Sequence, residues 1–241
     1  KSDSHRIPFK DVPFRQILTS RHVYIICFAA FGNSIILYAQ LTGHPKYLSS
    51  VFGVSKAMAS YLSIIPFMSN FLFQILYPLI FDYSRFSHRI SKTSYRRISS
   101  AIAFFGSAIF LAPVGFVSCD RMSISILLVT LSMVFLGANQ SGFFTGIIDL
   151  SPRYSGIIMA LASCFGSFSG ILQPQITSYL IKNGDRKEGY MLAFIITSII
   201  AYLTGVPYIL FGTSKLQNWN NKEKEKSKID ESTVLLNECD L

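Results

Sequence analysis

The distribution of apolar and charged residues divides the chain into long uncharged stretches separated by short charged segments. A helix that crosses the hydrocarbon core of a bilayer needs about 20 mostly apolar residues. Six stretches near or above that length contain no Lys, Arg, Asp or Glu: 22–40, 58–81, 99–117, 123–148, 155–181 and 190–213. The sequence therefore predicts an all-α polytopic membrane protein with six transmembrane helices.

Composition agrees with this pattern and excludes several classes of protein. Half of the 241 residues are hydrophobic, only 15% are charged, and the mean hydropathy is +0.40. A soluble domain usually has about 25% charged residues, and a disordered chain has few apolar ones. The uncharged stretches do not alternate in polarity as the strands of a membrane barrel do. The four cysteines form no C-x-x-C pair that would suggest a metal or redox site. Because the composition also argues against an ordinary soluble enzyme, we expect no metal, no cofactor and no enzymatic activity.

The basic residues are unevenly shared between the segments that connect the predicted spans. Of the 22 Lys and Arg residues, 16 fall in the N-terminal segment, the second and fourth loops and the C-terminal tail. Because cytosolic loops carry the excess of Lys and Arg, both termini are predicted to be cytosolic. The net charge of +9 then reflects orientation and does not indicate nucleic-acid binding. We expect a cytosolic linker or amphipathic segment at 1–21, a six-helix bundle at 22–213 and a disordered cytosolic tail at 214–241.

Neutral polar residues recur on single faces of the predicted helices. Asn33 and Gln40 are seven residues apart, as are Ser125, Ser132 and Asn139, and that spacing keeps side chains on one face. Such groups either bond neighbouring helices together or face a wet cavity, and both interpretations stay open. If a cavity is present, the candidate substrate-binding residues are Asn33, Tyr38, Phe67, Asn70, Asn139 and Ser163.

Two further features concern packing and titration. Gly166 and Gly170 form a G-x-x-x-G step, which allows two helices to approach closely. His22 and His44 lie at the ends of predicted spans, where a histidine is usually solvated. A histidine there is more often solvated than functional, and the alternative is that its pKa of about 6.5 lets it sense the pH of an acidic organelle.

Several ordered motifs resemble one family of membrane transporters. Asp149-Leu-Ser-Pro-Arg153-Tyr154-Ser, between the fourth and fifth spans, resembles the D-x-[SA]-P-R-Y-[AS] signature of the phosphate, sialic acid and vesicular glutamate transporters of the major facilitator superfamily. Further similarities occur in the same order at Tyr38 to Gly53, at Leu62 to Phe67, at Phe81-Asp82-Tyr83, at Arg96-Arg97 and near Trp219. The resemblance covers nearly the whole chain and points to the C-terminal six-helix half of a twelve-helix fold.

The resemblance implies a secondary transporter of a small organic or inorganic anion, working by alternating access and coupled to H⁺ or Na⁺. The chain starts at Lys1 without a methionine, which suggests a fragment of a longer protein. Vesicular glutamate transporters have an Arg where this chain has Asn33, so a glutamate substrate is disfavoured. One alternative is a truncated, non-transporting membrane protein that binds or regulates a full-length relative. A six-helix channel is another.

The resemblance also suggests charged gates at the cytosolic ends of the helices. Asp82 would pair with Arg96 and Arg97 between the second and third spans. Asp149 and Arg153 flank the next cytosolic turn, four residues apart, and would form a second latch. A pairing of this kind favours one conformation over another. The alternative is that the arginines only set the topology.

The predicted tail contains a short motif of a different kind. Glu231, Leu235 and Leu236 match the E-x-x-x-L-L pattern that clathrin adaptors read as a sorting signal. The expected location is therefore the plasma membrane or an endolysosomal or vesicular membrane, with an adaptor as a further partner.

Overall fold

The computed structural model describes residues 12–86, 90–118, 120–182 and 185–217, without the side chains of 82–86. Helices are the regular elements of these residues, and no strand occurs among them. In chain order the elements are α1 (Phe14–Leu18), α2 (Arg21–Tyr38), η2 (Ala39–Gly43), α3 (His44–Val51), α4 (Lys56–Leu62), α5 (Ile64–Phe86), α6 (Lys92–Leu111), η3 (Ala112–Phe116), α7 (Met122–Gly137), η4 (Ala138–Gln140), α8 (Phe143–Leu150), α9 (Ser155–Lys182) and α10 (Arg186–Phe211).

The described helices include six that are long and apolar enough to span a membrane, as the sequence predicts. They are Arg21–Val51, Lys56–Phe81, Lys92–Phe116, Met122–Leu150, Ser155–Lys182 and Arg186–Phe211. The third differs most at its start, because it begins at Lys92 and so includes Arg96 and Arg97. These two arginines were expected in a loop. Ser91 caps this helix by accepting a hydrogen bond from the Ser94 N–H, which explains the earlier start.

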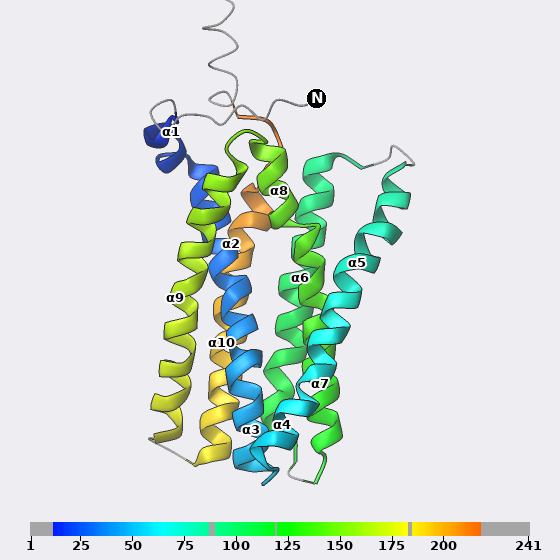
Figure 1. Ribbon diagram of the computed structural model, residues 1–241, viewed down its shortest axis with the longest axis vertical. Coiled ribbons are helices and arrows are strands. Elements are labelled where there is room, and N and C mark those ends of the chain that lie inside the picture. Colours follow the sequence, from blue (N-terminus) through cyan, green and yellow to red (C-terminus); the bar gives the residue numbers. More distant parts are fainter. Residues whose placement is uncertain (1–11, 87–89, 119, 183–184, 218–241) are drawn as a thin grey trace, which may run out of the picture.

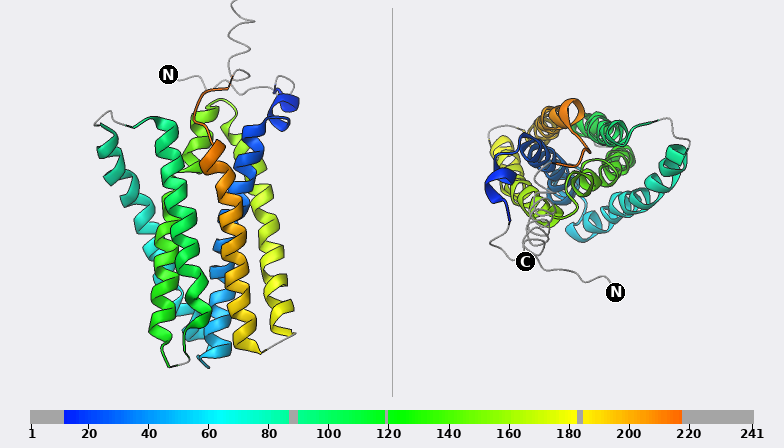
Figure 2. Two further views of the ribbon diagram at one scale, coloured as in Figure 1. Left: turned by 180° about the vertical axis from the view of Figure 1, so that it is seen from behind. Right: turned by 90° about the horizontal axis from the view of Figure 1, so that it is seen from above.

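The helices run side by side, with the turns gathered at two ends (Figure 1). We call the end that carries α1 and α8 the upper end, and the end that carries α3 and α4 the lower end. The central α2 packs against α9 and α10, while α7 packs against α5 and α6. Figure 2 shows α10 and α6 on the face opposite to the one seen in Figure 1.

The first span is longer than predicted and changes its helical type on the way. A π-helical stretch, Ala39–Gly43, joins α2 to α3, with Pro45 in the first turn of α3. Proline has no N–H, and its ring clashes with the carbonyl oxygen four residues earlier in a regular helix. The wider π turn therefore lets the helix continue to Val51 through a proline that would otherwise bend or end it.

The second span is the most exposed of the six. It is divided at Ser63 into α4 and α5, and α5 leans away from the other helices in the view from above (Figure 2). Only 17% of the apolar stretch of this span is buried. The corresponding fraction is 22% for the span formed by α9 and 33% to 56% for the other four spans. These two helices therefore have the largest surface left for contact with lipid or with another protein.

The glycine step on α9 makes the close contact that the sequence predicts. A Cβ atom on Gly166 would lie 2.6 Å from the Ser34 hydroxyl, and one on Gly170 would lie 2.8 Å from the Tyr38 ring. Larger residues would push α9 away from α2. The step therefore sets the distance between these two helices.

Candidate functional site

Asn33 and Asn139 form a pair in the middle of the bundle. Asn139 lies in η4, a short break between α7 and α8, and only 1% of it is exposed. Its Nδ2 donates a hydrogen bond of 2.9 Å to Oδ1 of Asn33, which is half-buried on α2. The bond occupies the acceptor of Asn33 and leaves its N–H groups to donate elsewhere. An amide held in this way presents hydrogen-bond donors, which suit an anion.

Tyr38 lies one to two turns further along α2, on the side that faces α9. Its half-buried ring packs on Gly170, and its backbone carbonyl accepts a bond of 2.8 Å from Thr42 Oγ1. Ser163, on α9, is exposed. The structure thus places Tyr38 at the contact between two helices and Ser163 on the open surface of one of them.

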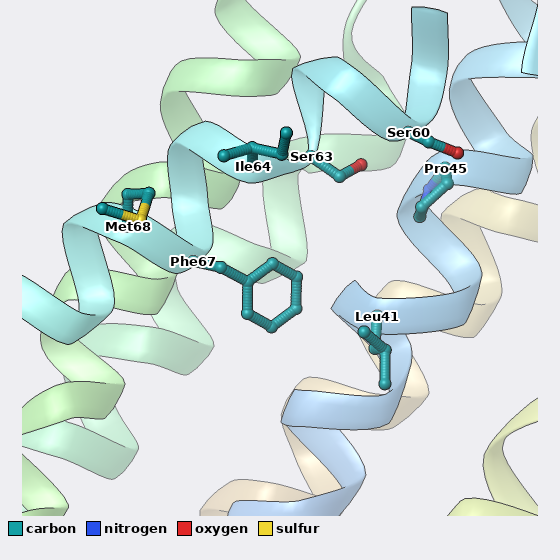
Figure 3. A pocket seen from close by; sticks show the side chains of 7 residues that line it. All are labelled: Leu41, Pro45, Ser60, Ser63, Ile64, Phe67 and Met68. Carbon is teal, nitrogen blue, oxygen red and sulfur yellow. The ribbon is translucent and has the colours of Figure 1, made fainter. Parts of the chain in front are cut away.

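Phe67 lines a cavity near the lower end of the bundle. The cavity has a volume of about 340 Å³ and is lined by Leu41, Pro45, Ser60, Ser63, Ile64, Phe67 and Met68. Figure 3 shows the ring of Phe67 projecting from α5 toward Leu41 and Pro45. The Ser60 and Ser63 hydroxyls donate to backbone carbonyls of their own helix, so the lining is mostly apolar. It can take a hydrophobic part of a ligand but offers little to a charge.

Asn70 is buried inside the bundle, where it bonds two helices together. It is 8% exposed, and its Nδ2 donates a bond of 2.6 Å to the backbone carbonyl of Met133 on α7. Its Oδ1 accepts a bond of 2.6 Å from Nε2 of Gln74. The amide is thus bonded at both ends: Nδ2 joins α5 to α7, and Oδ1 is bonded within α5. This is the interhelical use of a polar residue, one of the two interpretations that the sequence left open.

The charged residues at the upper end are paired differently from the sequence prediction. Nε of Arg96 lies 2.8 Å from Oδ2 of Asp149, and Nη1 donates a bond of 2.8 Å to the carbonyl of Ser141. The sequence places Asp149 and Arg153 on either side of a cytosolic turn and suggests that they form a latch. The structure ends α8 at Leu150 and starts α9 at Ser155, so the two residues do flank a turn, and the ion pair of Asp149 is with Arg96 on α6.

The remaining gate candidates are Arg97, Arg153 and Asp82. Nε of Arg97 donates a bond of 2.7 Å to the carbonyl of Gly212, just after α10. The guanidinium of Arg153 lies 5.8 Å from the centre of the Tyr154 ring. Asp82 is part of α5, but its side chain lies outside the described residues. The expected sorting residues Glu231, Leu235 and Leu236 also lie outside them.

Two buried polar residues escaped the sequence prediction of the site. Gln40 donates from Nε2 to the Ser132 hydroxyl at 2.8 Å, and that hydroxyl donates to the carbonyl of Ser107 at 2.9 Å. His44, expected to be solvated, is only 1% exposed. The reason is that the first span continues to Val51, so His44 is not at its end. The proline that follows His44 was the available signal for an unusual helix.

Comparisons with known proteins agree with the sequence motifs. No family model matches the chain. It is 27% identical over 219 residues to a putative inorganic phosphate cotransporter of Drosophila melanogaster, 31% over 232 residues to vesicular glutamate transporter 3 of Danio rerio, and 30% over 210 residues to human sialin. These matches cover 90%, 95% and 87% of the chain but only 41%, 38% and 42% of the relatives. The chain thus spans about two fifths of their length.

The similarity confirms the resemblance found in the sequence. This chain is related to the anion-transporter branch of the major facilitator superfamily.

Proposed function

We propose that this relative of the phosphate, glutamate and sialic acid transporters is the C-terminal half of a secondary transporter that moves a small organic or inorganic anion by alternating access. The observation that carries the proposal is the Asn33–Asn139 pair. It orients amide N–H donors near the middle of the first span without adding a charge. An anion can be bound by such donors and released again, because neutral hydrogen bonds are weaker than charge-assisted ones.

The uneven burial of the spans supports the proposal that another part of the protein completes the pathway. The least buried spans are Lys56–Phe81 and Ser155–Lys182. The face of α9 that carries Ser163 and Ser167 is polar as well as exposed, and polar groups are costly in contact with lipid. A second six-helix half that covers α5 and α9 would shield these groups and leave an aqueous path between the halves, as in other transporters built from repeats.

The Arg96–Asp149 pair is a candidate for a gate at the upper end, which we infer to be cytosolic from the excess of Lys and Arg there. It joins α6 to α8 and is largely buried. A pair that forms in only one conformation stabilises that conformation. We propose that the predicted gate residues Arg97 and Arg153 assist by holding the ends of α10 and α9. Asp82 stays a prediction in the same role.

The test is uptake of labelled phosphate, sialate and glutamate by the complete gene product in proteoliposomes, with and without Na⁺ and with a pH step. We expect uptake of at least one anion, dependent on H⁺ or Na⁺. Asn33→Asp, which keeps the size of the side chain and adds a negative charge, should weaken anion binding at least about tenfold, or about 1.4 kcal/mol. Asn33→Gln is the matched control. Equal uptake by the two variants would remove Asn33 from the binding site.

The alternative is a non-transporting membrane protein that binds or regulates a full-length relative. It predicts no uptake by any product of the gene and a stable complex with a full-length relative. The proposed sorting motif Glu231, Leu235 and Leu236 and the adaptor that would read it are tested separately. Leu235→Ala with Leu236→Ala should move the protein from an endolysosomal or vesicular membrane to the plasma membrane.

A further inference from the structure

The π-helical stretch carries two polar side chains that are buried and incompletely hydrogen-bonded. Gln40 lies within it and His44 directly follows it, and each is 1% exposed. Oε1 of Gln40 and both ring nitrogens of His44 have no hydrogen-bond partner among the residues that the structure describes. A buried polar group without a partner costs about 1–3 kcal/mol. Three such atoms within five residues therefore require an explanation.

The direction of the Gln40 hydrogen bond follows from its neighbours. The single proton of the Ser132 hydroxyl is donated to the carbonyl of Ser107 at 2.9 Å. Ser132 can then only accept at its oxygen, so the Gln40 amide must present Nε2 to it, at 2.8 Å. Rotating the amide by 180° would place two acceptors against each other. Oε1 of Gln40 is therefore the atom that stays available to another group.

His44 adds complementary groups on the same side of the helix. A π turn contains more residues than the 3.6 of an α turn, so residues four apart nearly complete one turn. Gln40 and His44 thus lie one above the other. A neutral imidazole has one N–H donor and one acceptor nitrogen. Together the two residues offer two acceptors and one donor, which match a water molecule, since water both donates and accepts.

A hydrated metal ion fits this position less well. Hard cations take several oxygen ligands, and the only unpartnered oxygen of the pair is Oε1 of Gln40. An imidazole nitrogen is instead a good acceptor for a proton. We propose that Gln40 and His44 enclose a site for a water-borne proton, and that His44 is the group that binds it.

The surrounding helices contribute few groups that could balance a charge at this site. The elements packed against η2 and α3 include α2, α4, α9 and α10, and side chains of η2 and α3 also reach Ser132 on α7 and Val114 in η3. The buried titratable groups near the site are the phenols of Tyr47 and Tyr190, and Tyr47 donates to the carbonyl of Val114 at 3.2 Å. The other titratable groups at the lower end of these elements are half-buried or exposed: Tyr38, Lys46, Lys56, Tyr61, Tyr179, Lys182, Asp185, Arg186, Lys187 and Glu188.

A proton on His44 would therefore be a positive charge with no buried carboxylate beside it among the described residues. A charge placed in this way inside a membrane protein is costly unless a counter-charge is near. An anion in the transport path would supply that counter-charge. Leu41 and Pro45, the residues that directly follow Gln40 and His44, line the cavity shown in Figure 3. The stretch of helix that carries the site therefore also borders this mostly apolar cavity, so the counter-charge has to come from the anion itself.

The idea that an anion supplies the counter-charge rests on the proposed transport of an anion. Binding of the anion and of the proton would then strengthen each other, because linkage between two sites is reciprocal. Such linkage couples the flow of an anion to a proton gradient.

The test is nuclear magnetic resonance of the protein with ¹⁵N-labelled histidine in lipid nanodiscs. The chain has four histidines, His5, His22, His44 and His88. The complete gene product is used, and its His44 signals are those that are lost in His44→Gln and in a second variant, His44→Asn. Gln substitutions of the other three histidines should leave these signals in place. The titration runs from about pH 8 to about pH 5, the range in which histidine changes charge in proteins, with and without inorganic phosphate. Phosphate binding is measured on the same samples by calorimetry.

We expect the His44 signals to change from neutral imidazole to imidazolium within this range when phosphate is present, because the bound anion supplies the counter-charge that the buried residues lack. We also expect phosphate to move the midpoint upward by about one pH unit, which corresponds to about tenfold linkage. His44 signals that stay in one protonation state at every pH would overturn the site. Phosphate that binds without moving the midpoint would overturn the coupling. Titration of His44 with no binding of phosphate, sialate or glutamate would support the proton site and count against the proposed function.

Discussion

The guanidinium of Arg96, in the second turn of α6, lies 2.8 Å from the carboxylate of Asp149, in the last turn of α8. The two residues are 53 positions apart in the sequence. The same guanidinium also donates to the carbonyl of Ser141, next to the break η4. One side chain therefore ties α6 to both ends of the short helix α8.

Neutralising Asp149 should destabilise the protein. Asp149→Asn keeps the size of the side chain but leaves the largely buried Arg96 without its counter-charge, and breaking such a pair costs about 3 kcal/mol. Thermal unfolding in detergent measures the loss. Asp120→Asn, at an exposed aspartate of the lower end, is the control and should change little. Equal midpoints for the two variants would contradict a stabilising role of the pair.

A side chain on Gly166 should disturb the contact between α2 and α9. Gly166→Leu places atoms where the Ser34 hydroxyl lies, 2.6 Å from the Cβ position, and overpacking of this kind costs about 1–3 kcal/mol. Gly156→Leu is the matched control, because a Cβ on Gly156 meets nothing within 4 Å. Size-exclusion profiles and unfolding midpoints of the two variants should differ clearly. Similar values would mean that α2 and α9 separate at little cost.

Asn70 should prove structural, although the sequence makes it a candidate for substrate contact. Asn70→Ala removes the bond to the Met133 carbonyl, and an interhelical hydrogen bond in a membrane contributes about 0.6–2 kcal/mol. We expect a stability loss of that size and an unchanged affinity for anions. Calorimetry with phosphate measures the affinity. A large loss of affinity in a folded variant would return Asn70 to the binding site.

The segment after α10 should be held to the upper end by Thr93. The backbone N–H of Ser214 donates to Thr93 Oγ1 at 3.2 Å, and that of Gln217 donates to the carbonyl of Leu150 at 3.2 Å. Thr93→Val keeps the shape but removes the acceptor, so the amide of Ser214 should exchange its hydrogen faster. Hydrogen–deuterium exchange measures this. Ser94→Ala, at the exposed neighbour, should leave the exchange rate unchanged.

The six spans could be predicted from the sequence because the hydrocarbon core imposes a length and a composition on each helix separately. The exact residues at which the helices begin and end could not be predicted in this way. Arg96 and Arg97 look like loop residues because they are charged, but a helix that continues beyond the hydrocarbon core can contain them once Ser91 caps it. The first span passes Pro45 only because a π turn takes up the distortion.

The candidate site was predicted in part for the same reason. Spacing along one helix shows that Asn33 and Gln40 share a face, but not which helix that face meets. Asn33 meets Asn139 across 106 positions of sequence, and Gln40 meets Ser132 across 92. Asn70 follows the same kind of polar spacing, but its Nδ2 is already bonded to the carbonyl of Met133 on the neighbouring helix α7. The burial of His44 depends on the neighbours of α3, which no local pattern specifies.

The sequence by itself determined the membrane architecture, the uneven distribution of basic residues and the relationship to anion transporters, since these follow from local composition and from motifs of contiguous residues. The tertiary structure decided which polar groups are satisfied and which stay available. Arg96 pairs with Asp149, Asn139 orients Asn33, and Gln40 and His44 retain unused atoms. The reason is physical: a hydrogen bond needs a partner within about 3 Å, and helices distant in the sequence supply that partner only after they have packed.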